Sequence, residues 1–167
     1  QRRIPEGFTK EQATGFAVDT LKRTIDGISK AGVMLCLEPL SPPDADFINT
    51  AEEGLAIVEK INHPNYCLHL DVKAMSTEPE PTTEVIRKYI GNTGHFHAND
   101  SNLRGPGFGS VDFVPIFQAL LEKKYTGWVS VEVFDYKPDP ETIATQSISY
   151  MKDCEMKARN LLPNSLR

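Results

Sequence analysis

The fold is decided by a pattern that occurs four times: MLCLEP at residues 34–39, CLHLDV at 67–72, HFHAND at 95–100 and VSVEVF at 129–134. Each segment has the apolar, β-branched or aromatic residues of a short buried strand. Each also carries a side chain that can bind a metal ion, and these are Glu38, Asp71, His97 and Glu132. Successive ligands are 33, 26 and 35 residues apart, which accommodates a strand, a helix and a return to the next parallel strand.

Helix signals fill the intervals between these strands. Thr9 and Gln12 match a capping box and predict a helix from Thr9 to Ala31, which Gly32 ends. Further helices are predicted at residues 50–61, 82–90, 112–123 and 139–162, and strands at 33–38, 66–72, 94–98 and 128–134. One helix followed by four strand-helix units implies parallel strands with right-handed crossovers.

Alternation within the strands separates a polar face from an apolar face. The residues two positions before the ligands share their face, and these are Cys36, His69, His95 and Ser130. A polar inner face at the carboxyl ends of parallel strands is where TIM barrels build active sites. We therefore expect an α/β fold of the (β/α)8 TIM barrel type. A full barrel needs eight strand-helix units in roughly 250 residues. Residues 1–167 are therefore expected to form a single domain that corresponds to about half of a barrel.

Composition restricts the location and the partners. With 167 residues, 40% of them hydrophobic, the chain can bury one core, and its net charge of −5 argues against a nucleic-acid partner. No apolar run approaches the roughly 20 residues of a membrane span, and the first residues lack the apolar core of a signal peptide. We therefore expect no membrane partner and a cytoplasmic location. The start at Gln1 and the four units lead us to expect a fragment, whose open strand edges favour a homo-oligomer.

Several conspicuous residues are interpreted as structural. Cys36 and Cys67 lie inside predicted strands without a CxxC pair, so we expect reduced thiols that pack like small apolar side chains. Trp128 and Phe134 flank the last strand and are also expected to pack.

The chain resembles the xylose isomerase-like TIM barrels from about Val33 to Tyr136, in particular the sugar isomerases and epimerases such as D-tagatose 3-epimerase and hydroxypyruvate isomerase. The resemblance rests on LEPL, LHLDVKAM, GHFHANDSNLRGPGFGSVDF and GWVSVEVF, which correspond to the family's last four strand ends. It implies that this chain is the C-terminal half of such a barrel. It also implies one divalent metal ion, Mn²⁺, Mg²⁺ or Co²⁺ with Zn²⁺ as an alternative, bound by Glu38, Asp71, His97 and Glu132.

The resemblance further implies a catalytic mechanism. In family epimerases two glutamates lie on opposite faces of a ketose, where one removes a proton beside the carbonyl and the other returns one. Here they correspond to Glu132 and Glu38. The metal polarises the carbonyl, and its charge stabilises the enediolate. The implied partner is a small ketose, sugar phosphate or sugar acid.

The substrate site departs from the family pattern. Ala74 replaces a substrate-binding His, Asp44 replaces a longer Glu, and Leu103 occupies the position of an Arg. The expected substrate contacts are therefore Asp44, Lys73, Asn99 and Arg104. The GPGFG segment lacks the Lys of a P-loop and is interpreted as a turn that positions Asn99, Asp100 and Arg104 over the site.

His69 and His95 precede ligands on the same face, and we expect them to support the ligands or to pack in the core rather than to bind the metal. Other functions stay open on this scaffold. One is a metal-dependent dehydratase similar to inosose dehydratase. A second is a hydrolase similar to endonuclease IV, which needs more histidines than the four present. A third is a catalytically incomplete fragment.

Overall fold

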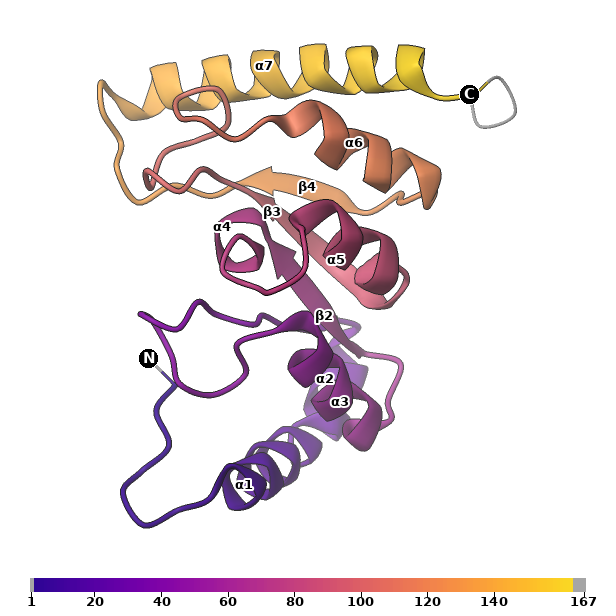
Figure 1. The fold of residues 1–167 in the computed structure, drawn as a ribbon. Helices are drawn as coiled ribbons and strands as arrows, with labels where there is room; N and C mark the ends of the chain where they lie inside the picture. Colours follow the sequence, from indigo (N-terminus) through magenta and orange to yellow (C-terminus); the bar gives the residue numbers. More distant parts are fainter. Residues whose placement is uncertain (1, 164–167) are drawn as a thin grey trace.

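The structure is a computed structural model that describes residues 2–163, and these contain one four-stranded sheet. Its strands are β1 (Leu35–Leu37), β2 (Tyr66–Asp71), β3 (Thr93–Ala98) and β4 (Trp128–Val131). They pair in parallel and in chain order, with helices between them (Figure 1). This is the arrangement of part of a (β/α)8 barrel, which confirms the predicted fold class.

The helices form a layer on the outer face of the sheet. They are α1 (Lys10–Lys22), α2 (Ile25–Ala31), α3 (Ala51–Ile61), α4 (Val72–Met75), α5 (Thr82–Tyr89), α6 (Phe113–Glu122) and α7 (Pro140–Leu161), with a 3-10 turn at Ile90–Asn92. From α3 onward each long helix packs beside the next one along the chain (Figure 1). Among the described residues, no helix combines the length and the apolar composition that crossing a membrane requires.

The predicted single helix from Thr9 to Ala31 is wrong, because the chain breaks it into α1 and α2. The capping box of Thr9 and Gln12 is present. At the break the Thr24 hydroxyl donates to the Leu21 carbonyl at 2.9 Å and also contacts the Tyr66 hydroxyl on β2. A side chain that bonds to a carbonyl of the preceding turn and to a neighbouring strand favours a bend over a continuous helix.

The largest core lies between the sheet and its helices. Leu68, Leu70 and Phe96 point from the strands into this layer and are fully buried, as the alternation predicts. Ile86 of α5 and Phe113 of α6 lie in the same cluster. The opposite face carries the polar residues, so the sheet has one apolar, buried face and one face with the candidate site residues.

A β-bulge at Gly94 sets the register between β2 and β3. Leu68 pairs with Thr93, whereas the next residue, His69, pairs with His95, so Gly94 is the extra residue. A Cβ atom at Gly94 would lie 2.3 Å from the Sγ of Cys67, which leaves room for glycine alone. Beyond the bulge the register continues and places Asp71 directly beside His97.

The two aromatic residues beside β4 differ from expectation. Trp128 is 79% exposed and Phe134 is 60% exposed, so the interpretation of both as packing residues is wrong. The physical reason is that β4 lies at one end of the described sheet and pairs with β3 on one side only.

Gly94→Ala is expected to destabilise the protein by about 1–3 kcal/mol, because the new methyl group overpacks the two sulfur atoms of Cys36 and Cys67. Urea unfolding measures the effect. Gly91→Ala is the matched control, since a Cβ there meets nothing within 4 Å, and it should be neutral or slightly stabilising. Equal effects of the two substitutions would contradict the tight packing at the bulge.

Candidate metal centre

Four side chains converge at the carboxyl ends of the four strands. Glu38 directly follows β1, Asp71 ends β2, His97 lies in β3 and Glu132 directly follows β4. Each offers one ligand atom, and these atoms all lie within 4.8 Å of one another. Because the strands are parallel and adjacent, their carboxyl ends meet at one edge of the sheet, so residues far apart in the sequence become neighbours.

His97 occupies the middle of this cluster. Its Nδ1 atom lies 3.3 Å from Oε2 of Glu132 and 3.7 Å from Oδ2 of Asp71. The backbone N–H of Glu132 donates to the carbonyl of Ala98 at 3.2 Å, which ties the end of β4 to β3. Both carboxylates therefore lie close to the same ring nitrogen of His97.

Asp71 and Asn99 are locked together by hydrogen bonds. The Ala74 N–H donates to Oδ1 of Asp71 at 2.8 Å, so the carboxylate caps the short helix α4. The Asn99 amide donates to Oδ2 of Asp71 at 2.6 Å and to Oε2 of Glu132 at 3.4 Å, while its oxygen accepts the Lys73 N–H at 2.8 Å. Asn99 therefore holds two carboxylates and the start of α4 in one arrangement. The sequence missed α4 because four residues carry too little pattern.

The cluster concentrates negative charge. Burial, followed by the nearby carboxylates of Asp71 and Glu132, raises the pKa of Glu38 to about 7. Burial also raises the pKa of Glu132, against the opposing effect of His97. For Asp71 burial acts in the same direction, but the contacts with His97, Ala74 and Asn99 outweigh it and lower its pKa. The pKa of His97 is raised, because the surrounding carboxylates outweigh its burial.

These residues fit a divalent cation. Three carboxylates and one imidazole form an oxygen-rich donor set that suits Mn²⁺, Mg²⁺ or Co²⁺. The Nδ1 atom of His97 is buried and, among the described residues, makes no hydrogen bond of acceptable geometry. A cation at the centre of the cluster would give this atom a partner and offset the repulsion between the three carboxylates.

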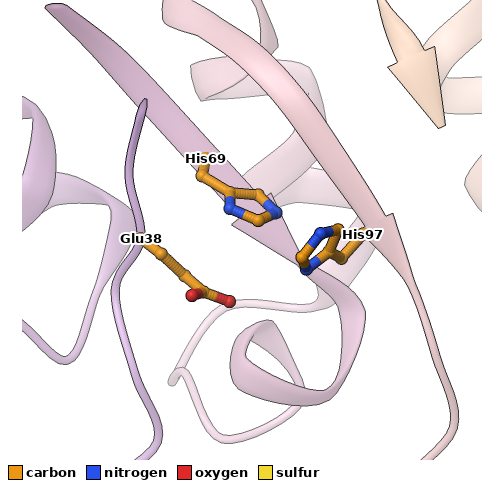
Figure 2. A group of neighbouring side chains, drawn as sticks. All are labelled: Glu38, His69 and His97. Atoms are coloured by element: carbon orange, nitrogen blue, oxygen red, sulfur yellow. The ribbon is translucent and has the colours of Figure 1, made fainter. Parts of the chain in front are cut away.

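A second group of ligand atoms contains His69. Glu38, His69 and His97 converge from three neighbouring strands (Figure 2) and also offer atoms within 4.8 Å of one another. The rings of His69 and His97 are nearly perpendicular, with centroids 3.9 Å apart. Burial, reinforced by His97, lowers the pKa of His69 to about 4, so its imidazole is neutral. Neutral imidazole is the form that binds metals. His69 therefore lies closer to the candidate ligands than its predicted role as a supporting or core residue implies.

His95 lies further from the ligand atoms and, within the described part of the chain, belongs to neither of the two converging groups. Its ring centroid is 5.3 Å from those of both His69 and His97. Burial lowers the pKa of His95 as well. The three imidazoles thus form one contiguous group, of which His97 also contacts the carboxylates.

A cavity of about 490 Å³ opens beside the cluster. Its lining includes the ligands Glu38, Asp71 and Glu132 together with Leu40, Ser41, Asp44, Lys73, Ala74, Asn99, Leu103 and Phe134. The Lys73 ammonium lies 3.1 Å from Oδ2 of Asp44, which also accepts a hydrogen bond from Ser41 at 2.6 Å. A larger hollow of about 880 Å³ lies between α1 and α3 and contains none of the ligands.

The sequence placed some pocket residues and missed others. Asp44, Lys73 and Asn99 line the cavity, whereas Arg104 does not: its guanidinium donates to the Lys137 carbonyl and stacks 4.6 Å from the Phe108 ring. The neighbouring Leu103 lines the cavity instead. Asp100 is also turned away, since it is fully buried and its carboxylate accepts the Val111 N–H at 3.0 Å.

Ser41 and Phe134 are pocket residues that the sequence did not predict. The spacing Ser41-x-x-Asp44 is typical of a hydroxyl that bonds to a carboxylate three residues later, so this signal was present. Phe134 carried no comparable signal, because nothing in its neighbourhood shows that β4 stops at Val131 and leaves the ring exposed.

A parallel part-barrel with acidic and imidazole ligands at its strand ends defines a TIM-barrel protein with a candidate metal centre. The profile of the xylose isomerase-like TIM barrel family matches residues 3–154, and the chain belongs to this family.

The relatives of the chain include sugar epimerases and isomerases. The D-psicose 3-epimerase of Ruminiclostridium cellulolyticum is 32% identical over 118 residues, which cover 71% of this chain and 40% of the relative. The hydroxypyruvate isomerase of Escherichia coli is 25% identical over 145 residues, 85% of this chain and 55% of that one. A solved structure of an L-ribulose 3-epimerase has a TM-score of 0.82 at 25% identity and covers 95% of this chain and 63% of its own. The chain thus spans less than two thirds of the length of each of these relatives.

Metal binding is expected to weaken as the pH falls below about 7. In the metal-free cluster the pKa of Glu38 is about 7 and that of His97 is raised, so in acid a cation must displace protons from both. Each displaced proton weakens the apparent affinity about tenfold per pH unit. Calorimetric titration with Mn²⁺ at several pH values measures the slope, and an affinity independent of pH would contradict the proposed ligands.

Proposed function

We propose that this chain carries the metal centre and the acid-base residues of a divalent-metal-dependent ketose isomerase or epimerase. The observation that carries the proposal is the convergence of Glu38, Asp71, His97 and Glu132 within 4.8 Å beside a cavity of sugar size. The named activities of the relatives, which are 3-epimerases and a hydroxypyruvate isomerase, support it.

Glu38, Asp71, His97 and Glu132 are proposed to bind one ion, with Mn²⁺, Mg²⁺ or Co²⁺ preferred for the oxygen-rich donor set and Zn²⁺ as an alternative. When bound, the ion would supply Lewis-acid polarisation of the substrate carbonyl and a positive charge close to the reacting oxygens. Asn99 has a positioning role, because its amide holds both Asp71 and Glu132.

Glu132 and Glu38 are proposed to move the protons. The Glu132 carboxylate removes the proton from the carbon next to the carbonyl, the electron pair of the C–H bond forms the C=C bond of an enediolate, and the carbonyl oxygen takes the negative charge. The Glu38 carboxylate takes the proton of the hydroxyl group on that carbon and returns it to carbon, either to the opposite face of the same carbon, which gives an epimer, or to the former carbonyl carbon, which gives an isomer. In both cases the carbonyl forms again at the other carbon of the C=C bond, and the protonated Glu132 gives its proton to the oxygen that is left as an alkoxide. The low-dielectric surroundings raise the pKa of both carboxyl groups, which favours proton transfer near neutral pH.

The ends of β1 and β4 place the two glutamates at opposite ends of the ligand cluster in sheet order. A substrate in the cavity would therefore have one carboxylate on each side. Asp44, Lys73 and Ser41 form a hydrogen-bonded row on the cavity wall and are proposed to bind substrate hydroxyl groups.

Glu132→Gln is expected to lower proton exchange by about 10²–10⁴-fold, because the amide cannot accept the substrate proton. NMR in D₂O measures exchange at the carbon beside the carbonyl, with a panel of ketoses and saturating Mn²⁺. Metal content of each variant is measured in parallel, since Glu132 is also a proposed ligand. Loss of exchange with metal retained would assign Glu132 to proton transfer.

Cys36→Ser is the control for this experiment. Its side chain lies on the same face of the sheet but below the ligands, beside the Sγ of Cys67 at 3.3 Å, and exchange should stay close to that of the unmodified protein. Full exchange by the Glu132→Gln protein would exclude the proposed base. Formation of a dehydrated product in place of exchange would point to the dehydratase alternative.

A further inference from the structure

We propose that the substrate is an uncharged deoxyketose, with a terminal methyl group where the parent sugar has a hydroxymethyl group, and that Leu103 selects it. This inference rests on the proposed function, because it concerns the same cavity.

The side chain of Leu103 is fixed at the rim of the cavity. Its φ of 68° lies in the left-handed region, which is uncommon for a leucine. Three backbone hydrogen bonds stabilise this conformation: the Leu103 N–H donates to the Asp100 carbonyl at 3.0 Å, and the Leu103 carbonyl accepts from Phe134 at 2.8 Å and Asp135 at 2.9 Å. They join the loop after β3 to the loop after β4. The side chain is therefore held at the cavity by a turn that backbone hydrogen bonds stabilise.

Leu103 and Phe134, which are joined by a backbone hydrogen bond, form an apolar part of the lining. Leu40 and Ala74 are the other apolar lining residues. Leu103 is 41% exposed and Phe134 is 60% exposed, so both side chains are accessible to a substrate. A methyl group against these side chains gains from leaving water, whereas a hydroxyl group there loses its hydrogen bonds to water without replacement. The apolar part thus favours a carbon without oxygen.

The cavity offers no free cation among the described lining residues. Arg104 follows Leu103 but turns to the Lys137 carbonyl and the Phe108 ring, and Lys73 is paired with Asp44. The lining also contains the carboxylates of Glu38, Asp71 and Glu132. A phosphate or carboxylate group on the substrate would therefore meet these carboxylates without an unpaired cationic side chain among the described lining residues, and it would be repelled. An uncharged sugar avoids this repulsion.

Matched sugar pairs test the inference in the Mn²⁺-loaded protein. A 6-deoxyketohexose, a 1-deoxyketohexose and the phosphate ester of a ketohexose are each compared with the parent ketohexose by kcat/KM for proton exchange. We expect one deoxy sugar to exceed its parent about 10- to 100-fold, the range for one group in an apolar pocket. The position of that methyl group identifies the end of the sugar that contacts Leu103. The phosphate ester should be the poorest substrate.

Two substitutions at Leu103 separate selection from folding. Leu103→Arg should remove the preference by providing hydrogen-bond donors for a hydroxyl group, and Leu103→Met, which stays apolar and unbranched at Cβ, should retain it. Equilibrium binding of the same sugars to the Glu132→Gln protein, measured by calorimetry, should follow the same order. A preference unchanged by Leu103→Arg would overturn the role of Leu103.

The outcomes also separate this inference from the proposed function. Exchange that favours the parent sugars over both deoxy sugars, or that favours the phosphate ester, would overturn the inference and leave the isomerase or epimerase function standing. Absence of exchange with every ketose, in a protein that binds Mn²⁺, would overturn the proposed function and this inference together.

Discussion

The register between β2 and β3 is the constraint on which the site depends. The bulge at Gly94 inserts one residue into β3, and beyond it Asp71 and His97 become direct neighbours. A slip by one residue would turn His97 to the opposite face and separate it from the carboxylates. The bulge position requires glycine, because the sulfur atoms of Cys36 and Cys67 occupy the space that a Cβ at position 94 would need. Packing below the site therefore decides the ligand geometry above it.

The carboxylates of the cluster repel one another, and a cation between them would offset this repulsion. Buried carboxylates raise one another's pKa, which is seen at Glu38 and Glu132, and they repel each other unless a positive charge compensates them. Asn99 reduces part of this repulsion by donating to two of the carboxylates. The same arrangement that would bind a metal would also suit the proposed proton transfer, because both functions need charged groups in a partly dry environment.

The cavity is built from other parts of the fold than the candidate metal centre. The candidate ligands come from strand ends, whose positions the sheet determines, whereas the rest of the cavity wall comes from α4 and from the loops after β1, β3 and β4. Leu103 and Arg104 are adjacent in sequence, yet only Leu103 faces the cavity, because the left-handed turn at Leu103 rotates its neighbour toward Lys137. A shift of one position in this loop therefore places the apolar side chain of Leu103 at the cavity wall in place of the cationic side chain of Arg104.

The order of the strands, the parallel sheet, the two faces of each strand and the four ligand candidates could be predicted from the sequence, because these follow from local periodicity and from equivalent positions at strand ends. Tertiary structure alone decided the break between α1 and α2, where Thr24 contacts Tyr66 on another strand, and the nearness of His69 to the ligands. It also decided which loop side chains line the cavity, and it exposed Trp128 and Phe134 at the end of the sheet. The physical reason is that contacts between residues distant in sequence, and the backbone conformation of irregular loops, leave no periodic signal in the chain.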